Sequence, residues 1–447
     1  MNNEIRKTLY FVAVAIVLSL VAFIMSPKRI TPESFADQGL AFFPDFTDPN
    51  VATTLEVIEY DTATASPVPF KVTFKDGRWM IPSHHDYPAD GKDRLAKTAA
   101  GVIDVKKDDL RSTISADQEA CGVIDPSEAT AAIRGRGTRV TLRGAGDQSL
   151  ADFIVGKSVE GREGFRFVRV PGTSRIYSCR MNIELSTKFE DWIETDLLQV
   201  AKGKITDVTL RDYSINEQTY SVDQRENMTL ALTGGKWELK SAKGAKPDSM
   251  KVDSLLKTLD DLRIVGVRPK PAGLTANLTG DKGAVSQPDI MSLQSRGYYL
   301  SRDGQLLSNE GELIVGTSEG VVYTLRFGEV VYGSGTAVSA GLDGGDGKQG
   351  QGENRYLFVT ASFDAKNLKA PPKPSNTQFQ SKSEDQLTDE DRANKNLQAV
   401  YDDWQRNVDN GKKIASDLNI RFAKWYYVIS GKAFEALHLS RKDLLGK

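Results

Sequence analysis

A short segment occurs twice in the chain, and this repeat restricts the fold more than any other feature. Residues 75–82 read KDGRWMIP and residues 233–240 read TGGKWELK, so a Gly-x-Trp turn recurs. Eleven residues after each tryptophan stands an aspartate, Asp90 or Asp248, at a position suited to a helix N-cap. Apolar residues follow each aspartate at helical spacing, which predicts two amphipathic helices that face a core.

A third pair of segments follows in the same order. Residues 153–158 (FIVGKS) match residues 313–318 (LIVGTS), and their glycines lie 77 and 79 residues beyond the two tryptophans. Three landmarks in one order indicate an internal duplication. We therefore predict two tandem repeat domains, at residues 51–203 and 204–447.

The strand pattern within each repeat indicates the fold class. Charged and apolar residues alternate in segments such as 139–142 and 165–170, as in antiparallel sheets with one wet face. The prediction is an α+β fold, with two tandem repeats of mainly antiparallel sheet and packed helices. We expect Trp79 and Trp237 to pack the sheet of each repeat against its helix.

Two low-complexity insertions interrupt the second repeat, at about residues 333–354 and 366–420. The first is rich in Gly, and the second contains a Pro-, Ser- and Lys-rich part at 369–384; we expect both 333–354 and 369–384 to be mobile loops. Within the second insertion, Thr388 starts a helical pattern that Gly411 is expected to end.

An uncharged apolar segment occupies residues 8–25. As a helix it would be about 27 Å long, nearly the thickness of a bilayer core. The alternative is a cleaved signal peptide, but its apolar region is usually about 7–15 residues long and precedes a small-residue cleavage site. We predict a cytoplasmic stub and transmembrane anchor at 1–29, a linker at 30–50, and a single-pass protein of the inner (cytoplasmic) membrane with its body extracytoplasmic. The flanking charges are nearly symmetric and leave the orientation open: Arg6, Lys7, Lys28, Arg29.

The composition is that of an ordinary globular chain. Of 447 residues, 39% are hydrophobic and 26% are charged, and the net charge is -2. Such a charge provides no basic field for phosphate backbones, so we expect no nucleic-acid partner.

Candidate metal-binding and redox residues are few. Cys121 and Cys179 are the only cysteines, and the sequence leaves open whether they form a disulfide or stay unpaired. His84, His85 and Asp86 are adjacent, but neighbours in an extended segment point to opposite faces and no further ligand set is visible. We predict no metal-binding residues and no cofactor.

Three catalytic patterns match formally and lack the structural context that their chemistry needs. Residues 316–320 (GTSEG) fit a nucleophile elbow, but a strand follows, which indicates a hairpin turn. Residues 345–350 (GDGKQG) fit a dinucleotide-binding pattern inside a low-complexity loop. Residues 254–257 (SLLK) fit Ser-x-x-Lys, but their leucines belong to a core stripe. We predict no enzymatic activity, no catalytic residues and no cofactor-binding residues.

The paired Gly-x-Trp turns, the Ala-Asp and Pro-Asp helix starts, the CGVIDP turn at 121–126 and the Ile-Val-Gly strands together resemble the domain-of-unknown-function family 4340. The ending at 421–445 is similar to that of planctomycete-type, membrane-anchored members. This resemblance implies a non-catalytic accessory subunit of an ABC-2-type export system of the gliding-motility type, with an ABC permease and ATPase as partners and the membrane bound through residues 8–25. The alternative is an anchored extracytoplasmic binding module with an unrelated ligand or envelope partner. The second repeat has AGLTANLTG at 272–280 in place of CGVIDPSE, which leaves open whether both repeats bind the same thing.

Overall fold

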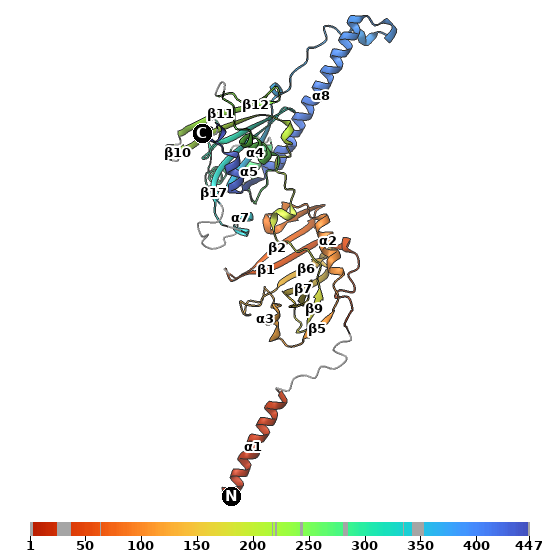
Figure 1. Cartoon of the computed structure of the whole chain (residues 1–447), viewed down its shortest axis with the longest axis vertical. Coiled ribbons are helices and arrows are strands. Elements are labelled where there is room, and N and C mark those ends of the chain that lie inside the picture. Colours follow the sequence, from red (N-terminus) through yellow and green to blue (C-terminus); the bar gives the residue numbers. More distant parts are fainter. Residues whose placement is uncertain are drawn as a thin grey trace. The chain divides into compact units, whose positions relative to one another are not determined.

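The structure is a computed structural model of the whole chain (Figure 1). It describes residues 3–24, 37–62, 64–216, 218–219, 221–241, 245–279, 285–333, 335–341 and 353–445. The chain divides into two compact units, one of Met1–Ala52, Ile58–Thr62 and Lys97–Glu184, the other of Thr53–Val57, Ala63–Ala96 and Leu185–Lys447. Residues 30–36 of the predicted linker lie outside the described residues. So do residues 334 and 342–352 of the predicted first insertion.

The first sheet is formed by strands from the N-terminal part of the chain. Within the described residues its order is β4-β3-β2-β1-β6-β7-β8-β9-β5. The pairs β2/β3, β3/β4, β5/β9, β6/β7, β7/β8 and β8/β9 are antiparallel. Its strands are β1 Thr54–Asp61, β2 Ser66–Lys75, β3 Arg78–Ile81, β4 Tyr87–Pro88, β5 Asp109–Ser112, β6 Thr138–Arg143, β7 Ser149–Ser158, β8 Phe165–Arg169 and β9 Ile176–Arg180.

The second sheet has the order β12-β11-β10-β16-β17-β18-β19-β13 among the residues that the structure describes. All its neighbouring strands pair antiparallel. A separate pair of strands, β14 and β15, lies between β13 and β16 in the sequence. The strands are β10 Ile205–Asn216, β11 Ser221–Thr233, β12 Lys236–Leu239, β13 Gly266–Pro269, β14 Tyr298–Leu300, β15 Leu306–Ser308, β16 Glu312–Thr317, β17 Val321–Val331, β18 Asn354–Phe363 and β19 Trp425–Ile429.

The two sheets share one strand order once the short β4 is set aside. Each begins with a three-stranded meander, continues through four further strands, and ends on a strand that comes early in the sequence, β5 or β13. These antiparallel sheets with their helices confirm the predicted α+β class. The third sequence landmark behaves differently, because β7 is separated from β1 by β6 whereas β16 lies directly beside β10. Residues 153–158 and 313–318 therefore occupy different places in the two sheets.

A helix follows the first meander of each sheet, as the sequence predicts. In α4 the side chain of Asp248 accepts hydrogen bonds from the backbone N–H groups of Met250 and Lys251, which confirms the predicted N-cap. Asp90 is not in the equivalent position, because α2 begins at Lys92. The helices are α1 Asn3–Ile24, α2 Lys92–Ile103, α3 Asp117–Cys121, α4 Ser249–Asp260, α5 Ala272–Thr279, α6 Gln287–Gln294, α7 Thr336–Ser339, α8 Asp389–Ala423, α9 Gly431–Leu437 and α10 Arg441–Leu445. Short 3-10 helices connect them: η2 Pro49–Val51, η3 Pro82–His84, η4 Ala145–Asp147, η5 Phe189–Trp192, η6 Lys202–Lys204, η7 Ala365–Asn367, η8 Gln378–Ser381 and η9 Glu384–Gln386.

The repeated tryptophans are half-buried and are not core anchors. Trp79 lies opposite Phe74 across the β2/β3 hairpin, and Trp237 lies opposite Leu232 across β11/β12. Phe74 is 43% exposed and Leu232 is 41% exposed, so both pairs lie on a partly open hairpin face. Both tryptophans are therefore only partly buried where they were expected to pack the sheet against a helix, since the end of a hairpin exposes one face of its side chains.

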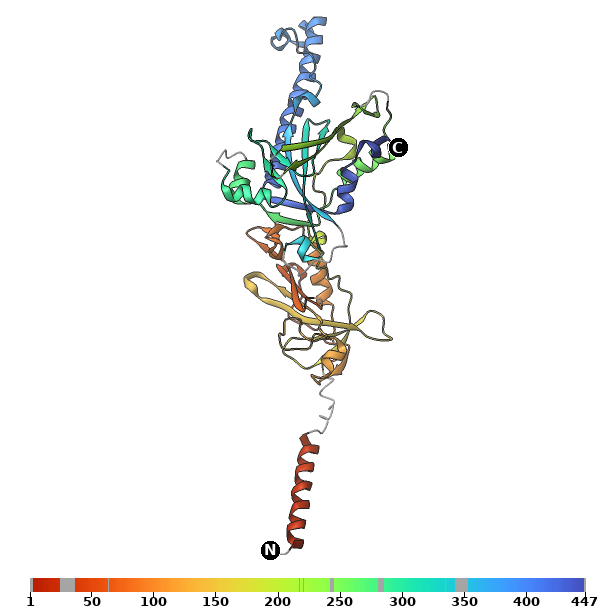
Figure 2. The same ribbon diagram turned by 90° about the vertical axis from the view of Figure 1, so that its left-hand side faces the viewer.

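Helix α8 differs most from the sequence-based expectation. It runs through Gly411 without a break and continues to Ala423. A Cβ on Gly411 would overlap the carbonyl oxygen of Glu319 and lie 2.6 Å from Cε2 of Phe363, so this glycine allows close packing of the helix and does not end it. Figures 1 and 2 show the N-terminal part of α8 extending away from the second sheet while its C-terminal part lies against it.

The Pro-rich part of the second insertion is held against α8. The backbone N–H of Ser375 donates to Oδ1 of Asn394 at 2.8 Å, and Nζ of Lys382 donates to Oδ2 of Asp391 at 2.7 Å. Lys373 lies 5.3 Å from the ring centroid of Tyr401. Residues 369–384 are thus an ordered cover on the helix, contrary to the mobile loop expected from their composition.

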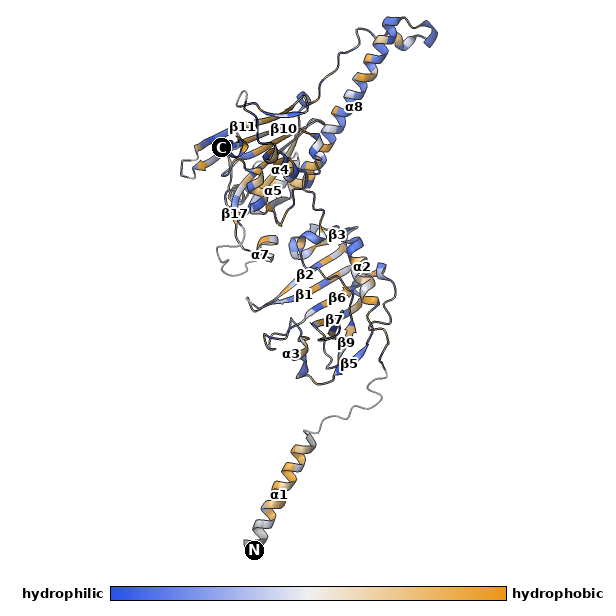
Figure 3. Ribbon diagram, viewed as in Figure 1, coloured by the Kyte–Doolittle hydropathy of each residue, from blue (hydrophilic) through white to orange (hydrophobic). Residues whose placement is uncertain are grey.

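The described part of α1 is hydrophobic (Figure 3). Its large apolar side chains are exposed, with Phe11 at 77% and Tyr10 at 70%. Across the residues that the structure describes, no helix is both long enough and apolar enough to be assigned as a membrane span. Met25, at the end of the predicted anchor, lies outside those residues.

Candidate functional site

The CGVIDP segment forms the end of helix α3 and the turn after it. Gly122 has φ 71°, a left-handed conformation that glycine adopts without strain, and it ends the helix. Its N–H donates to the carbonyl of Glu119 at 3.1 Å, and the N–H of Val123 donates to that of Gln118 at 2.9 Å. These two bonds satisfy the last carbonyls of α3 and direct the chain back toward the sheet.

A second loop, residues 134–137, is fixed on top of this turn. The N–H of Ile124 donates to the carbonyl of Gly135 at 3.0 Å, and the N–H of Gly137 donates to the carbonyl of Ile124 at 2.8 Å. The guanidinium of Arg136 adds hydrogen bonds of 3.0 Å to two carbonyls of the same turn, those of Asp125 and Pro126. The loop therefore has one position relative to α3.

Strand β7 supports the turn from below. A Cβ on Gly156 would overlap the carbonyl oxygen of Cys121 and lie 2.6 Å from Cγ1 of Val123. Arg139 links the turn to the sheet, with Nη1 3.1 Å from Oδ2 of Asp125 and Nη2 2.7 Å from Oδ2 of Asp152. The CGVIDP segment is thus a packing and ion-pair element, and its residues leave little room to act on a ligand themselves.

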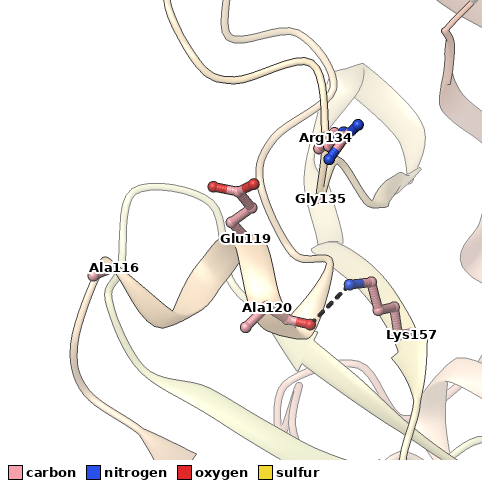
Figure 4. A pocket seen from close by; sticks show the side chains of 6 residues that line it. All are labelled: Ala116, Glu119, Ala120, Arg134, Gly135 and Lys157. Atoms are coloured by element: carbon pink, nitrogen blue, oxygen red, sulfur yellow. Dashed lines mark hydrogen bonds between the residues drawn. The ribbon is translucent and has the colours of Figure 1, made fainter.

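Between α3, the 134–137 loop and β7 lies a hollow, which we call the α3 notch. Its volume is about 350 Å³. Three charged side chains border it from three different elements, Glu119 from α3, Arg134 from the loop and Lys157 from β7 (Figure 4). Nζ of Lys157 donates to the carbonyl of Ala120 at 3.0 Å, near the C-terminus of α3, where a cation is favoured.

Sequence reasoning did not single out any of these three charged residues. They are spread over 39 positions, from 119 to 157, and no motif joins them. The feature of the sequence that could have pointed to them is the pair of glycines nearby, Gly122 and Gly135. The structure shows why these are glycines: a Cβ on Gly135 would lie 2.7 Å from Cα of Glu119, and one on Gly122 would lie 2.8 Å from Cγ of Lys157.

The two cysteines are separate buried thiols. Both are free, and burial raises the pKa of each thiol, that of Cys179 to about 12. Neither thiol is therefore in the thiolate form that nucleophilic chemistry requires at neutral pH.

The histidines considered as metal ligands have other partners. His84 is buried, its ring stacks on Phe189 with 4.6 Å between centroids, and its Nδ1 lies 3.0 Å from Oγ of Ser83. In the part of the chain that the structure describes, no group of three His, Cys, Asp or Glu side chains is arranged to hold a metal ion.

The rejected catalytic patterns can be placed in the structure. Residues 316–320 span the hairpin between β16 and β17, which confirms the turn predicted there. Residues 254–257 lie in α4, where Leu255 and Leu256 are buried. Residues 345–350 lie outside the described residues.

A second hollow, of about 430 Å³, lies within the C-terminal unit and includes residues of α4, α9 and η5. Three of its four charged side chains already have partners, and the fourth, Glu190, is exposed. Arg263 lies 3.1 Å from Asp261, and Oγ of Ser186 donates to Asp191 at 2.5 Å. The α3 notch is the better candidate because its charged groups are less engaged.

The lining of the notch limits its chemistry. Its residues are Ala116, Glu119, Ala120, Arg134, Gly135 and Lys157. A nucleophile and a base within hydrogen-bond reach would be needed for acyl or phosphoryl transfer, and this lining includes no Ser, Cys or His. The arrangement suits the binding of a charged group.

The fold and the notch define a class of α+β protein with two antiparallel sheets of like strand order and a charged surface hollow in the N-terminal unit. The family described as Domain of unknown function (DUF4340) matches residues 79–277. This match supports the family resemblance found in the sequence, and it runs from β3 to α5 across the predicted boundary between the repeats. No curated protein and no solved structure gives a significant match to the chain.

Proposed function

We propose that this protein is a non-catalytic, membrane-anchored, extracytoplasmic accessory subunit of an ABC-2-type export system, with an ABC permease and its ATPase as partners. The match of residues 79–277 to the DUF4340 family carries this proposal. Resemblance to that family implies the association with ABC export, and two features of the chain support it.

The first supporting feature is the apolar N-terminal segment. We propose that residues 8–25 cross the inner membrane once, with residues 1–7 in the cytoplasm and the body on the other side. Apolar side chains that surround a helix, such as Leu18 at 62% exposure, need a cover that lipid would supply. A tether of this kind raises the local concentration of the body next to a membrane partner.

The second supporting feature is the common strand order of the two sheets. We propose that they are two copies of one duplicated domain, at residues 51–203 and 204–447. Two similar domains on one tether allow several weak contacts with a partner to add up, so that no deep ligand pocket is required.

The proposal is tested by purification of the tagged full chain from membranes in mild detergent. An ABC permease or its ATPase should be recovered with it and should remain bound at moderate salt. A variant without residues 8–25 is the control and should lose the partner. Recovery of the protein alone, together with unchanged export after its deletion, would exclude the accessory role.

Membrane orientation needs its own experiment. Both native cysteines are buried, so a cysteine introduced at the exposed Thr377 gives a single accessible thiol in the part of the chain described. A membrane-impermeant thiol reagent should label Thr377→Cys in cells whose outer membrane is permeabilised and whose inner membrane is intact. Labelling only after lysis would place the body in the cytoplasm.

An anchored binding module with an unrelated ligand is the second candidate function. The α3 notch favours it, because its charged side chains border a hollow large enough for a small molecule. Under this alternative, deletion of the protein leaves export unchanged while a notch variant has the same phenotype as the deletion.

A further inference from the structure

The α3 notch is a built feature of the N-terminal unit. Gly135 has φ 75° and lies so close to Glu119 that a Cβ there would be 2.8 Å from its Cγ. Gly122 approaches the stem of Lys157 equally closely. Two glycines thus permit the close approach of α3, the loop and β7, and this approach holds the bases of the charged side chains at set positions around one hollow.

The charged groups at its border keep free bonding capacity. In the described part of the chain, the guanidinium of Arg134 and the carboxylate of Glu119 make no side-chain hydrogen bond or ion pair, and both residues are exposed. Lys157 uses one of its three N–H donors for the carbonyl of Ala120. Two cations and one anion therefore remain available to a ligand.

This combination of charges selects among simple ions. A plain anion would be attracted by Arg134 and Lys157 and repelled by Glu119. A plain cation would be attracted by Glu119 and repelled by Arg134 and Lys157. A molecule with one charge of each sign can satisfy all three side chains: its oxyanion pairs with the two cations, and its ammonium pairs with the carboxylate.

We propose that the α3 notch binds a small zwitterion whose ammonium and oxyanion are a few bonds apart, as in a free amino acid or in the phosphoethanolamine head of a lipid. The hollow of about 350 Å³ accommodates a ligand of this size. This inference is independent of the proposed role in export, since it rests on the notch alone.

The test uses the full chain in detergent micelles and isothermal titration with five probes: L-alanine, phosphoethanolamine, acetate, inorganic phosphate and ethylamine. We expect at least one zwitterion to bind about 10-fold more tightly than any of the three singly functional ions. Preference for L-alanine identifies a free amino acid as the ligand class, and preference for phosphoethanolamine identifies a lipid head.

Variants assign the binding to the notch. Arg134→Gln should weaken zwitterion binding, and Glu119→Gln should abolish the preference for zwitterions while improving binding of acetate and phosphate. Glu160→Gln, at another exposed glutamate of the same unit, is the matched control and should change nothing. Equal urea midpoints of all three variants show that they remain folded.

Three results would overturn the inference. One is an absence of saturable zwitterion binding. Another is phosphate binding as tight as that of either zwitterion, which would define a plain anion site. The last is zwitterion binding that Arg134→Gln leaves unchanged.

Discussion

Lys270 donates a hydrogen bond of 3.0 Å from Nζ to the backbone carbonyl of Phe422, in the last turn of α8. Its ammonium also lies 3.8 Å from the ring centroid of Phe358. The residue is 6% exposed, and burial lowers its pKa well below the ordinary value for lysine. The C-terminus of a 35-residue helix carries partial negative charge that favours a cation, but burial of the amine outweighs this attraction and the pKa is lowered.

We predict that Lys270→Met removes a pH dependence of stability. Between the depressed pKa of Lys270 and the ordinary lysine value, the unfolded chain binds more protons than the folded chain, so wild-type stability rises with pH in that window. Relative to the variant, the wild-type free energy of unfolding should rise with pH by up to about 1.4 kcal/mol per pH unit. Urea denaturation at several pH values measures this, with the exposed Lys432→Met as control. Parallel pH profiles for Lys270→Met and the wild type would show that this amine is charged in the folded state.

His84 should make the protein less stable in mild acid. Burial, with a smaller effect of the neighbouring His85 charge, lowers the pKa of His84 from 6.5 to about 4. The contribution of neutral His84 to the free energy of unfolding is fully present above pH 6.5 and is lost as the pH falls toward 4. In this range the unfolded chain binds a proton at this histidine that the folded chain does not bind. The loss over this range is roughly 3 kcal/mol.

The His84 prediction is checked by thermal or urea unfolding between pH 7.5 and about 4. His84→Gln should flatten the acid side of the profile, whereas His85→Gln should flatten it only slightly, because the His85 charge lowers the pKa of His84 less than burial does. If both variants follow the wild-type curve, carboxylates account for the acid sensitivity and the assignment to His84 is incorrect.

Gly156→Ala should destabilise the turn beneath the α3 notch. The new Cβ would overlap the carbonyl oxygen of Cys121, and overpacking of this kind costs about 1–3 kcal/mol. Gly203→Ala is the matched control, because open space surrounds that glycine and its backbone is not left-handed. Guanidinium denaturation midpoints should fall for the first variant only. A neutral Gly156→Ala would mean that β7 and α3 separate easily.

Asn394 should protect residues 369–384 from proteases. Its Oδ1 accepts a 2.8 Å hydrogen bond from the backbone N–H of Ser375, which holds the Pro-rich cover on α8. We expect Asn394→Ala to raise the rate of limited proteolysis in that segment several-fold, while the exposed Asn396→Ala keeps the wild-type rate. Rapid cleavage of the wild type at the same sites would return the segment to the mobile loop that its composition suggests.

Local signals in the sequence were sufficient for the secondary structure at several points. Asp248 caps α4 because an aspartate before a helical apolar stripe needs only its own backbone neighbours. The alternation in residues 139–142 and 165–170 similarly predicted β6 and β8. Asp90 failed as a cap because α2 begins one residue later than its counterpart, a shift that composition does not record.

Long-range packing decided what local patterns could not. Glycine is a residue type that often ends a helix, so the sequence predicted that the helix ends at Gly411. The carbonyl of Glu319 and the ring of Phe363 pack against Gly411 from the second sheet, and α8 continues beyond this residue. Trp79 is a large aromatic residue of the kind expected in a core, but its position in the β2/β3 hairpin leaves it half-buried on a partly open face.

The sequence alone determined the α+β class, the resemblance to the DUF4340 family, and the hairpins and helices whose periodicity depends on near neighbours. Only the tertiary structure decided the common strand order of the two sheets and the hollow that Glu119, Arg134 and Lys157 line. The physical reason is that strand pairing and glycine-permitted close approach join residues far apart in the chain, whose proximity leaves no periodic mark along it.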